Sequence, residues 1–231
     1  MKLLKPQPSL TEQVYEAIVD EICDGALPAG SHLVQEQLAE RLGVSRQPVQ
    51  QAMARLKADG MVEEVGRRGL WVTRLDADLM RHHYDIRAAL DGLAARMAAE
   101  RIAAGPERGQ QFTRAAAEIL ELGQRAVETG DVAGQVRHDM ALHTLIYDAS
   151  GNPLLARTAE PHWRFLRRAM SEVLRHATLP REIWRQHAEI VEAIAAGDAA
   201  RADTLMVAHD LAAAETLRAA LDVPAAEPAN T

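Results

Sequence analysis

Several features are scarce in this chain, and each scarcity excludes a class of protein. The 231 residues contain one cysteine, Cys23, so an internal disulfide framework is excluded. No apolar run approaches the roughly 18 residues that a membrane helix needs, and no apolar segment follows Met1-Lys2. We therefore expect a cytoplasmic protein with no membrane partner. Aromatic residues make up only 3% and β-branched runs are rare, which argues against an all-β fold.

The abundant residues are leucine, alanine, arginine and glutamate, all of which favour helices. The length allows one large domain or two smaller domains that each bury a core, and two is the better expectation. The composition therefore predicts a mainly α protein.

Charge is unevenly distributed along the chain. The net charge of −7 disfavours nucleic acid as a partner, because phosphates bind lysine and arginine. Residues 1–40 carry two basic and seven acidic side chains, whereas residues 41–74 carry seven basic and three acidic ones. The second segment therefore has the local positive charge that DNA binding requires.

Three helices are predicted in the first 60 residues. The segment 9–12, Ser-Leu-Thr-Glu, has the spacing of a capping box, and the helix that it begins stops at Gly25. A short second helix ends at Gly43. We expect Ser45 to cap the third helix.

The third helix has two distinct faces, and a predicted β-hairpin follows it. Helical periodicity places Val49, Ala52 and Leu56 on one face for packing. The opposite face, free to contact a partner, carries Arg46, Gln47, Gln50 and Lys57. Residues 61–65 and 70–73 flank Gly-Arg-Arg-Gly, which is typical of a hairpin with Arg67 and Arg68 at its tip. This order predicts a winged helix-turn-helix domain over residues 1–75.

The segment LAERLGVSRQPVQQAMARLKADGMV resembles the DNA-binding signature of GntR-type bacterial transcription regulators, and the resemblance covers about residues 9–74. It implies double-stranded operator DNA as the partner, contacted by Ser45, Arg46, Gln47, Gln50, Arg67 and Arg68; the alternative for each is a solvated surface. Family members usually carry Glu-Arg where this chain has Gln35-Glu36, and a second arginine at Gln50. Two cationic contacts are therefore missing, and glutamines that read bases would favour adenine, so the operator is expected to differ from the usual one.

Six helices are predicted after a short linker at residues 74–76. They span about 77–104, 106–129, 131–149, 153–176, 180–196 and 198–221, separated by glycine- or proline-containing breaks. These helices predict an all-helical bundle domain over residues 76–222. Residues 223–231 have too little apolar surface to fold and are predicted to be disordered.

Asp139 and His143 lie one helical turn apart, which suits a solvated ion pair, half of a metal site or an acid/base pair. His187 precedes Gly197 by ten residues and His209 follows it by twelve, so an antiparallel helical hairpin would bring them to similar heights. One carboxylate and three imidazoles suit Zn²⁺, Ni²⁺ or Mn²⁺. Histidines also cap, pack and pair, so spacing alone leaves these alternatives open.

Two segments, DMALHTLIYDASGNPLL and QHAEIVEAIAAGDAARADTLMVAHD, are similar to the FCD effector-binding domain of the FadR subfamily of GntR regulators. The resemblance implies a divalent metal bound by Asp139, His143, His187 and His209. It also implies that Arg87 receives an effector carboxylate; the alternative is an ion pair with Asp91. Arg164 and Arg167 are further effector-binding candidates, and Trp163 is expected in the core. His82, His83, His138, His162 and His176 are interpreted as surface or packing residues.

The expected function is a ligand-responsive transcription regulator, a homodimeric repressor that senses a small carboxylate such as a sugar acid or hydroxy acid. One alternative is a metal-dependent enzyme fused to a DNA-binding module, although no general base or zinc-hydrolase signature accompanies the ligands. Another is a constitutive repressor with a structural metal.

Overall fold

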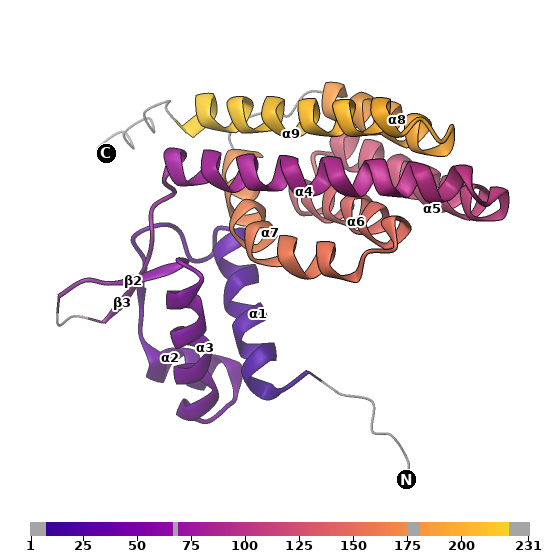
Figure 1. The fold of residues 1–231 in the computed structure, drawn as a ribbon. Helices are drawn as coiled ribbons and strands as arrows, with labels where there is room; N and C mark the ends of the chain where they lie inside the picture. The colour runs from indigo at the N-terminus through magenta and orange to yellow at the C-terminus, as the bar shows by residue number, and fades with distance from the viewer. Residues whose placement is uncertain (1–7, 67–68, 175–180, 222–231) are drawn as a thin grey trace, which may run out of the picture. The chain divides into compact units, whose positions relative to one another are not determined.

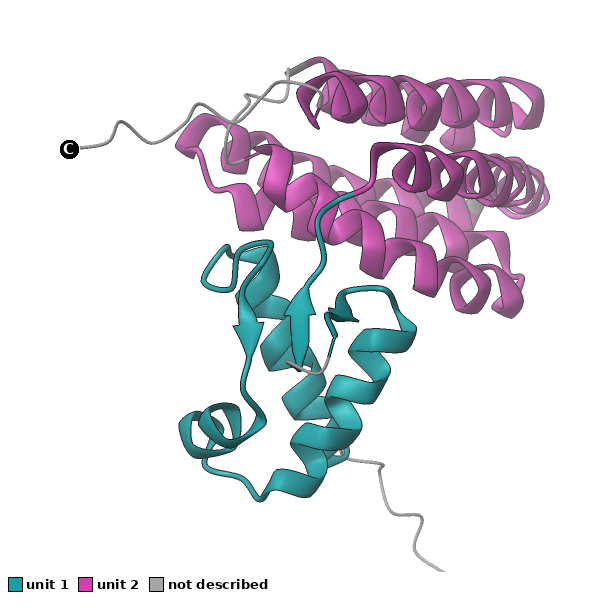
Figure 2. Ribbon diagram, turned by 90° about the vertical axis from the view of Figure 1, so that its left-hand side faces the viewer, with its two compact units in different colours: residues 1–75 teal, residues 76–231 magenta. Residues whose placement is uncertain are grey.

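The computed structural model describes residues 8–66, 69–174 and 181–221, and the chain divides into two compact units. The first is Met1–Leu75 and the second is Asp76–Thr231, shown in different colours in Figure 2. The wing arginines Arg67 and Arg68, His176 and the predicted disordered tail lie outside the described residues.

The first unit is a three-helix winged domain. Its elements are α1 (Leu10–Cys23), β1 (His32–Leu33), α2 (Gln35–Leu42), α3 (Arg46–Ala58), β2 (Val62–Glu64) and β3 (Leu70–Val72). The antiparallel sheet has the order β1-β3-β2, with Val62 opposite Val72 and His32 opposite Trp71. The expected hairpin is therefore present as β2 and β3. Strand β1 was not predicted, because two residues are too few to show an alternating pattern.

Local sequence explains the limits of the first three helices, with one correction. The Ser9 side chain accepts a hydrogen bond from the Glu12 amide at 3.1 Å, as a capping residue should. Gly43 ends α2 in the left-handed conformation, with φ of 65°. The prediction that Ser45 caps α3 is confirmed for its position but not for its side chain. Ser45 occupies the N-cap position in an extended conformation, but its side chain makes no capping hydrogen bond.

The core of this unit forms where α1 and α3 pack together. The predicted apolar face of α3 is fully buried at Val49, Ala52 and Leu56. These residues join Ile18 and Ile22 of α1 in one cluster. Because the inward face of α3 is used for packing, its polar face is left at the surface.

The second unit is the predicted helical bundle. Its helices are α4 (Ala77–Ala103), α5 (Pro106–Thr129), α6 (Val132–Ser150), α7 (Pro153–Leu174), α8 (Arg181–Ala195) and α9 (Ala199–Leu221). Asp76 caps α4 by accepting from the amides of Asp78 and Leu79, both at 2.9 Å. The six predicted helices are thus present in the described part of the chain, and the mainly α fold is confirmed.

Helices α4 and α9 run side by side (Figure 1) and form the most extensive helix pair of this unit. Ala94, Ala95, Ala98 and Ala99 of α4 are fully buried, and such small side chains allow close backbone approach. Helices α8 and α9 are joined at Gly197, whose φ of 72° suits glycine. None of the described helices combines the length and apolar composition needed to cross a membrane.

Candidate functional site

The first unit exposes the N-cap residue and the three α3 residues for which a role in recognition is expected. Ser45, Arg46, Gln47 and Gln50 are all exposed, on the side of α3 opposite its buried face. The structure therefore leaves these side chains accessible to a partner.

Most cations near this surface are already paired with carboxylates. Arg46 forms an ion pair with Glu36 of α2, and Lys57 lies 2.5 Å from Glu64 of β2. Arg55 pairs with Glu12, and its guanidinium lies 4.1 Å from the centre of the Tyr15 ring, so Arg55 braces α3 against α1. The local positive charge read from the sequence is thus partly neutralised within the fold. Sequence reasoning identified Glu36 as a departure from the family pattern but not as the partner of Arg46.

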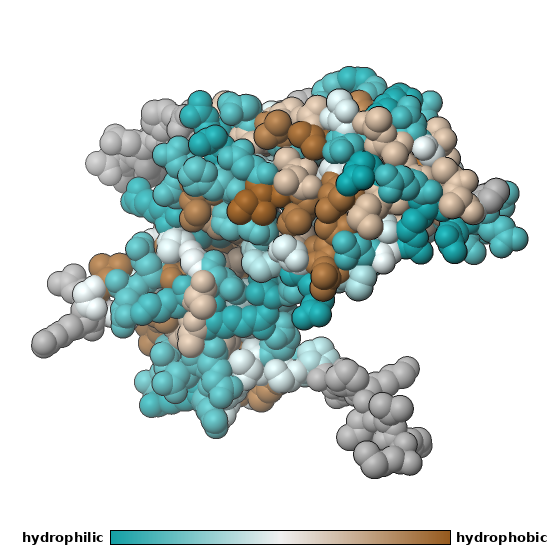
Figure 3. Space-filling model, viewed as in Figure 1, coloured by the Kyte–Doolittle hydropathy of each residue, from teal (hydrophilic) through white to brown (hydrophobic). Residues whose placement is uncertain are grey.

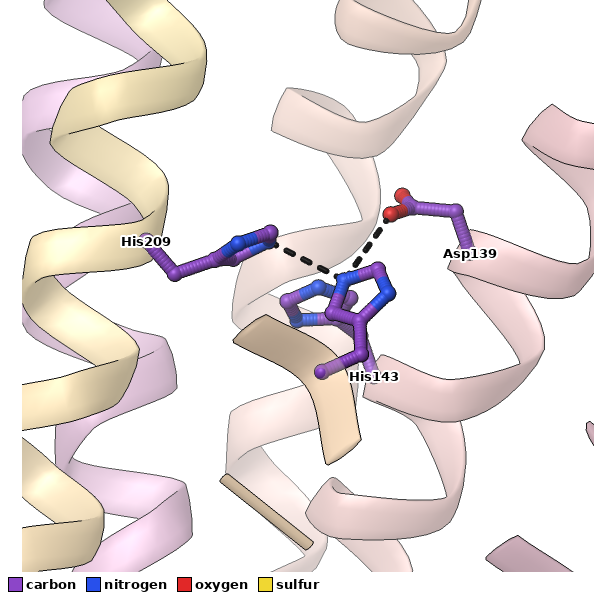
Figure 4. A group of neighbouring side chains, drawn as sticks. Asp139, His143 and His209 are labelled. Atoms are coloured by element: carbon purple, nitrogen blue, oxygen red, sulfur yellow. Dashed lines mark hydrogen bonds and ion pairs between the residues drawn. The ribbon is translucent and has the colours of Figure 1, made fainter. Parts of the chain in front are cut away.

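In the second unit, three helices bring the four candidate metal ligands together. Asp139 and His143 lie on α6, His187 on α8 and His209 on α9, and their ligand atoms all lie within 4.8 Å of one another. Figure 4 shows Asp139, His143 and His209 converging from α6 and α9. The three histidines are buried, and the Asp139 side chain is 14% exposed.

The donor atoms of this quartet approach at distances suited to a shared cation. His187 Nε2 lies 3.1 Å from His209 Nε2 and 3.3 Å from Asp139 Oδ1. Ligands bound at about 2.0–2.2 Å to one tetrahedral metal are separated by similar distances. Asp139 Oδ2 is buried without a hydrogen-bond partner among the described residues, whereas His209 Nδ1 is held by Gln186 Oε1 at 3.0 Å.

Arg87 of α4 lies beside the quartet in a buried ionic network. Its Nε donates to Asp91 Oδ2 at 2.9 Å, and one terminal nitrogen lies 3.2 Å from Asp210 Oδ1. The guanidinium also stacks on the Trp163 ring, 3.7 Å from its centre. Asp91 Oδ2 in turn lies 2.9 Å from His143 Nδ1. The alternative ion pair of Arg87 with Asp91 is therefore present, next to the proposed ligands.

A second acidic group, Asp91, His143 and Asp210, also has the geometry of a metal-binding set. Arg87 already contacts both of its carboxylates, so a guanidinium supplies the positive charge there. In the quartet, Arg87 approaches only the shared His143, 2.9 Å from its Nε2, and among the described residues Asp139 makes its ion pair with His187 instead. The quartet is therefore the better candidate for a metal.

Burial controls ionisation in the network. It lowers the pKa of His209, and neighbouring His187 lowers it further, while burial and Arg87 lower the pKa of His143. Neutral imidazole, the form that binds metals, is thereby favoured. Burial opposes ionisation of Asp139, but the contact with His187 keeps its pKa below the ordinary value. Burial raises the pKa of Asp210.

The remaining predicted residues take other positions. Arg164 pairs with Glu160, one turn earlier on α7. A cavity adjoins the quartet, and its lining includes Arg87 but not Arg164. His83 and His162 face each other with Nδ1 atoms 3.0 Å apart, consistent with a packing role. Trp163 is buried as expected, but it also contacts Arg87 and Tyr147.

Sequence reasoning missed Asp210 and Tyr147. Asp210 follows His209 directly, and the Tyr147 hydroxyl donates to Asp91 from one turn after His143. Their positions in the sequence, next to His209 and one turn after His143, were the features that could have identified them. Periodicity alone does not separate a buried carboxylate from a solvated one.

The fold and the site together define a class of protein: a winged helix-turn-helix unit joined to a helical unit with a buried Asp/His cluster. The matches to known families agree with this class. Residues 10–72 match the family described as bacterial regulatory proteins, gntR family, and residues 82–213 match the FCD domain. The chain belongs to the GntR family of transcription regulators and carries an FCD domain.

Similar proteins extend over nearly the whole chain. A Paenarthrobacter nicotinovorans protein named "probable D-xylose utilization operon transcriptional repressor" is 29% identical over 87% of this chain and 85% of its own length. The regulator LutR of Bacillus subtilis is 30% identical over 81% of this chain and 92% of its own. These relatives are transcription regulators rather than enzymes, and the chain is assigned accordingly.

Solved structures show the same fold. The Escherichia coli protein McbR/YncC has a TM-score of 0.76 at 23% identity, covering 91% of this chain and 98% of that one. A GntR regulator from Rhodococcus sp. RHA1 has a TM-score of 0.74 at 20% identity, covering 90% and 97%. At such identities the likeness concerns the fold alone.

Proposed function

We propose that this regulator senses a small carboxylate metabolite through a divalent metal held by Asp139, His143, His187 and His209. It acts as a homodimeric repressor whose affinity for operator DNA changes when the effector binds. Sugar acids and hydroxy acids are the first classes to consider. The names of two relatives, the P. nicotinovorans protein and RspR of E. coli, describe repressors, which supports this direction of control.

The metal assignment rests on one observation, an excess of negative charge around Arg87. Asp91 and Asp139, whose pKa values lie below the ordinary value, surround one cation, Arg87, together with Asp210, while His143 and His209 favour their neutral forms. A divalent ion would neutralise this excess, and protonation of Asp210 is the alternative in metal-free protein. The imidazole-rich donor set suits Zn²⁺ or Ni²⁺, and Mn²⁺ remains a candidate because of the carboxylate.

When bound, the metal would supply a positive centre that attracts effector carboxylate oxygens. Arg87 lies in the lining of the cavity beside the quartet and adds a second positive charge. Its guanidinium is held in place by Asp91 and Trp163, so little rotamer freedom is lost when an effector binds. The site therefore favours anions over neutral metabolites.

Operator contacts are assigned to the exposed face of α3 and to the wing. Ser45, Arg46, Gln47 and Gln50 are accessible, and Arg67 and Arg68 are proposed as backbone contacts from sequence alone. Coupling between effector and DNA is expected at the usual size of about 1–3 kcal/mol, or roughly 5- to 150-fold in affinity.

A homodimer is supported by apolar side chains at the surface of the second unit. Leu79 and Ile86 of α4 and Leu211 of α9 are between 44% and 47% exposed. Figure 3 shows apolar residues gathered over the part of the helical unit where α4 runs. Exposed apolar patches of this kind commonly mark interfaces between subunits.

Metal removal and one ligand substitution test the proposal. Protein stripped with a chelator and reloaded with Zn²⁺ should bind candidate carboxylates in calorimetry, and His187→Ala should lose both metal and carboxylate binding. The matched control is His82→Ala, an exposed histidine on α4 outside the quartet. Full zinc occupancy in His187→Ala would reject this ligand. Undiminished carboxylate affinity in metal-free protein would leave the metal with a structural role only.

A further inference from the structure

A cavity adjoins the metal-ligand quartet; its end at the quartet is polar, and its other end is mainly apolar. Among the described residues, Arg87, Asp139 and His209 line its polar end. The remainder of the lining is mainly apolar and includes Val136, Met170, Leu174, Ile183, Trp184 and Leu217. Tyr84 and Gln135 are the other polar side chains in the lining.

The spacing along the helices explains this separation. On α6, Val136 lies about one turn before Asp139, and on α8, Ile183 lies one turn before His187. On α9 the direction is reversed, because α8 and α9 run antiparallel: Ala213 and Leu217 follow His209 by one and two turns. Along the helix axes, the layer that contains Arg87, Asp139 and His209 is therefore followed by an apolar layer about 6–12 Å deep.

Few hydrogen-bonding groups are available in the apolar layer. Gln135 directs its Nε2 toward the Ala126 carbonyl oxygen at 3.4 Å. Tyr84 is buried, and its ring lies 5.5 Å from the Arg87 guanidinium. A ligand body in this layer would thus contact mainly aliphatic and indole side chains. A hydroxyl placed there would lose its bonds to water without finding enough replacements.

We propose that the effector is a small monocarboxylate with a short apolar body, bound with its carboxylate at the quartet and Arg87 and its body among the apolar side chains. This rests on the proposed metal-dependent carboxylate sensing, and it narrows the effector class by excluding polyhydroxylated sugar acids. The cavity volume of about 30 Å³ admits two or three waters by the usual measure of about 10–15 Å³ each. A ligand therefore enters by displacing wall side chains, and apolar side chains such as Met170 move without breaking hydrogen bonds.

Pairs of acids with equal carbon number test the proposal directly. Zinc-loaded, full-length protein is titrated by calorimetry with 2-hydroxyhexanoate and with D-gluconate, which share the carboxylate and the 2-hydroxyl group. The four-carbon pair 2-hydroxybutanoate and threonate controls for size. We expect the apolar member of at least one pair to bind at least about tenfold more tightly than its polyhydroxylated counterpart.

A nearly isosteric variant tests the role of the apolar layer. Val136→Thr replaces one methyl group of a buried lining side chain by a hydroxyl and should reduce the preference for the apolar acid by about threefold or more. Val173→Thr makes the same change at a buried position outside the lining and should leave the preference unaltered. Zinc content and circular dichroism establish that both variants are folded.

The outcomes separate this inference from the proposed function. Equal or tighter binding of the sugar acids would overturn the apolar-body inference and leave carboxylate sensing intact. Zinc binding without binding of any of the four acids would overturn both. Equal effects of the two threonine variants would show that the apolar layer does not select the effector.

Discussion

The pairing of Glu36 with Arg46 predicts that Glu36→Gln strengthens DNA binding. DNA must displace Glu36 before a phosphate or base can bind the Arg46 guanidinium, and the substitution removes that competition. The two side chains are 71% and 69% exposed, so the pair contributes at most about 1 kcal/mol. Releasing it should therefore tighten binding by up to about fivefold at low salt.

The salt dependence should change as well. In wild-type protein a contact from Arg46 to a phosphate leaves Glu36 unpaired, so part of the electrostatic gain is offset. In Glu36→Gln the same contact should steepen the slope of log affinity against log salt by up to about 0.9. Fluorescence anisotropy with a labelled non-specific duplex, between 50 and 200 mM salt, measures both quantities.

Two controls make this prediction refutable. Glu40→Gln removes an equal charge from an exposed position on the same helix and should have a smaller effect. In an Arg46→Ala background, Glu36→Gln should lose most of its effect, because Glu36 acts through Arg46. An unchanged affinity and slope in Glu36→Gln, or an equal gain without Arg46, would refute the reasoning.

Three further predictions concern other parts of the chain. Arg46→Ala should abolish specific operator binding without lowering the melting temperature, because the side chain is exposed; retained affinity in gel-shift titrations would contradict its assignment. Ile86→Asp should shift the protein toward monomer in analytical ultracentrifugation, whereas the same change at Leu122, another exposed apolar residue, on α5, should not. Burial and His162 lower the pKa of His83 to about 4 in the folded protein. The unfolded protein binds a proton at this residue below about pH 6.5, whereas the folded protein binds it only near pH 4. Stability should therefore fall between about pH 6.5 and 4, by about 1–2 kcal/mol from this residue after allowance for its partial exposure, and His83→Asn should reduce the loss in melting curves.

The helix limits of the second unit that fall inside the described ranges were predictable to within two residues because they depend on local chemistry. Gly105-Pro106 and Gly197 interrupt the helical pattern wherever they occur, whatever lies nearby in space. The approach of His187 to His209 was also predictable, since a short hairpin determines which residues of its two helices are level. Ser45 shows the limit of such reasoning, because residue type and position favoured a capping hydrogen bond that does not form.

By itself, the sequence determined the order of the elements, the buried face of α3 and the identity of a winged domain followed by a bundle. These follow from periodicity and from glycine and proline breaks. Only the tertiary structure decided that Arg87 pairs with both Asp91 and Asp210, that Glu36 pairs with Arg46, and that the cavity beside Asp139 is polar at one end. Except for Arg87 and Asp91, which are one turn apart, these contacts join separate helices. Their partners depend on how helix faces rotate and pack, which the local pattern of either helix does not specify.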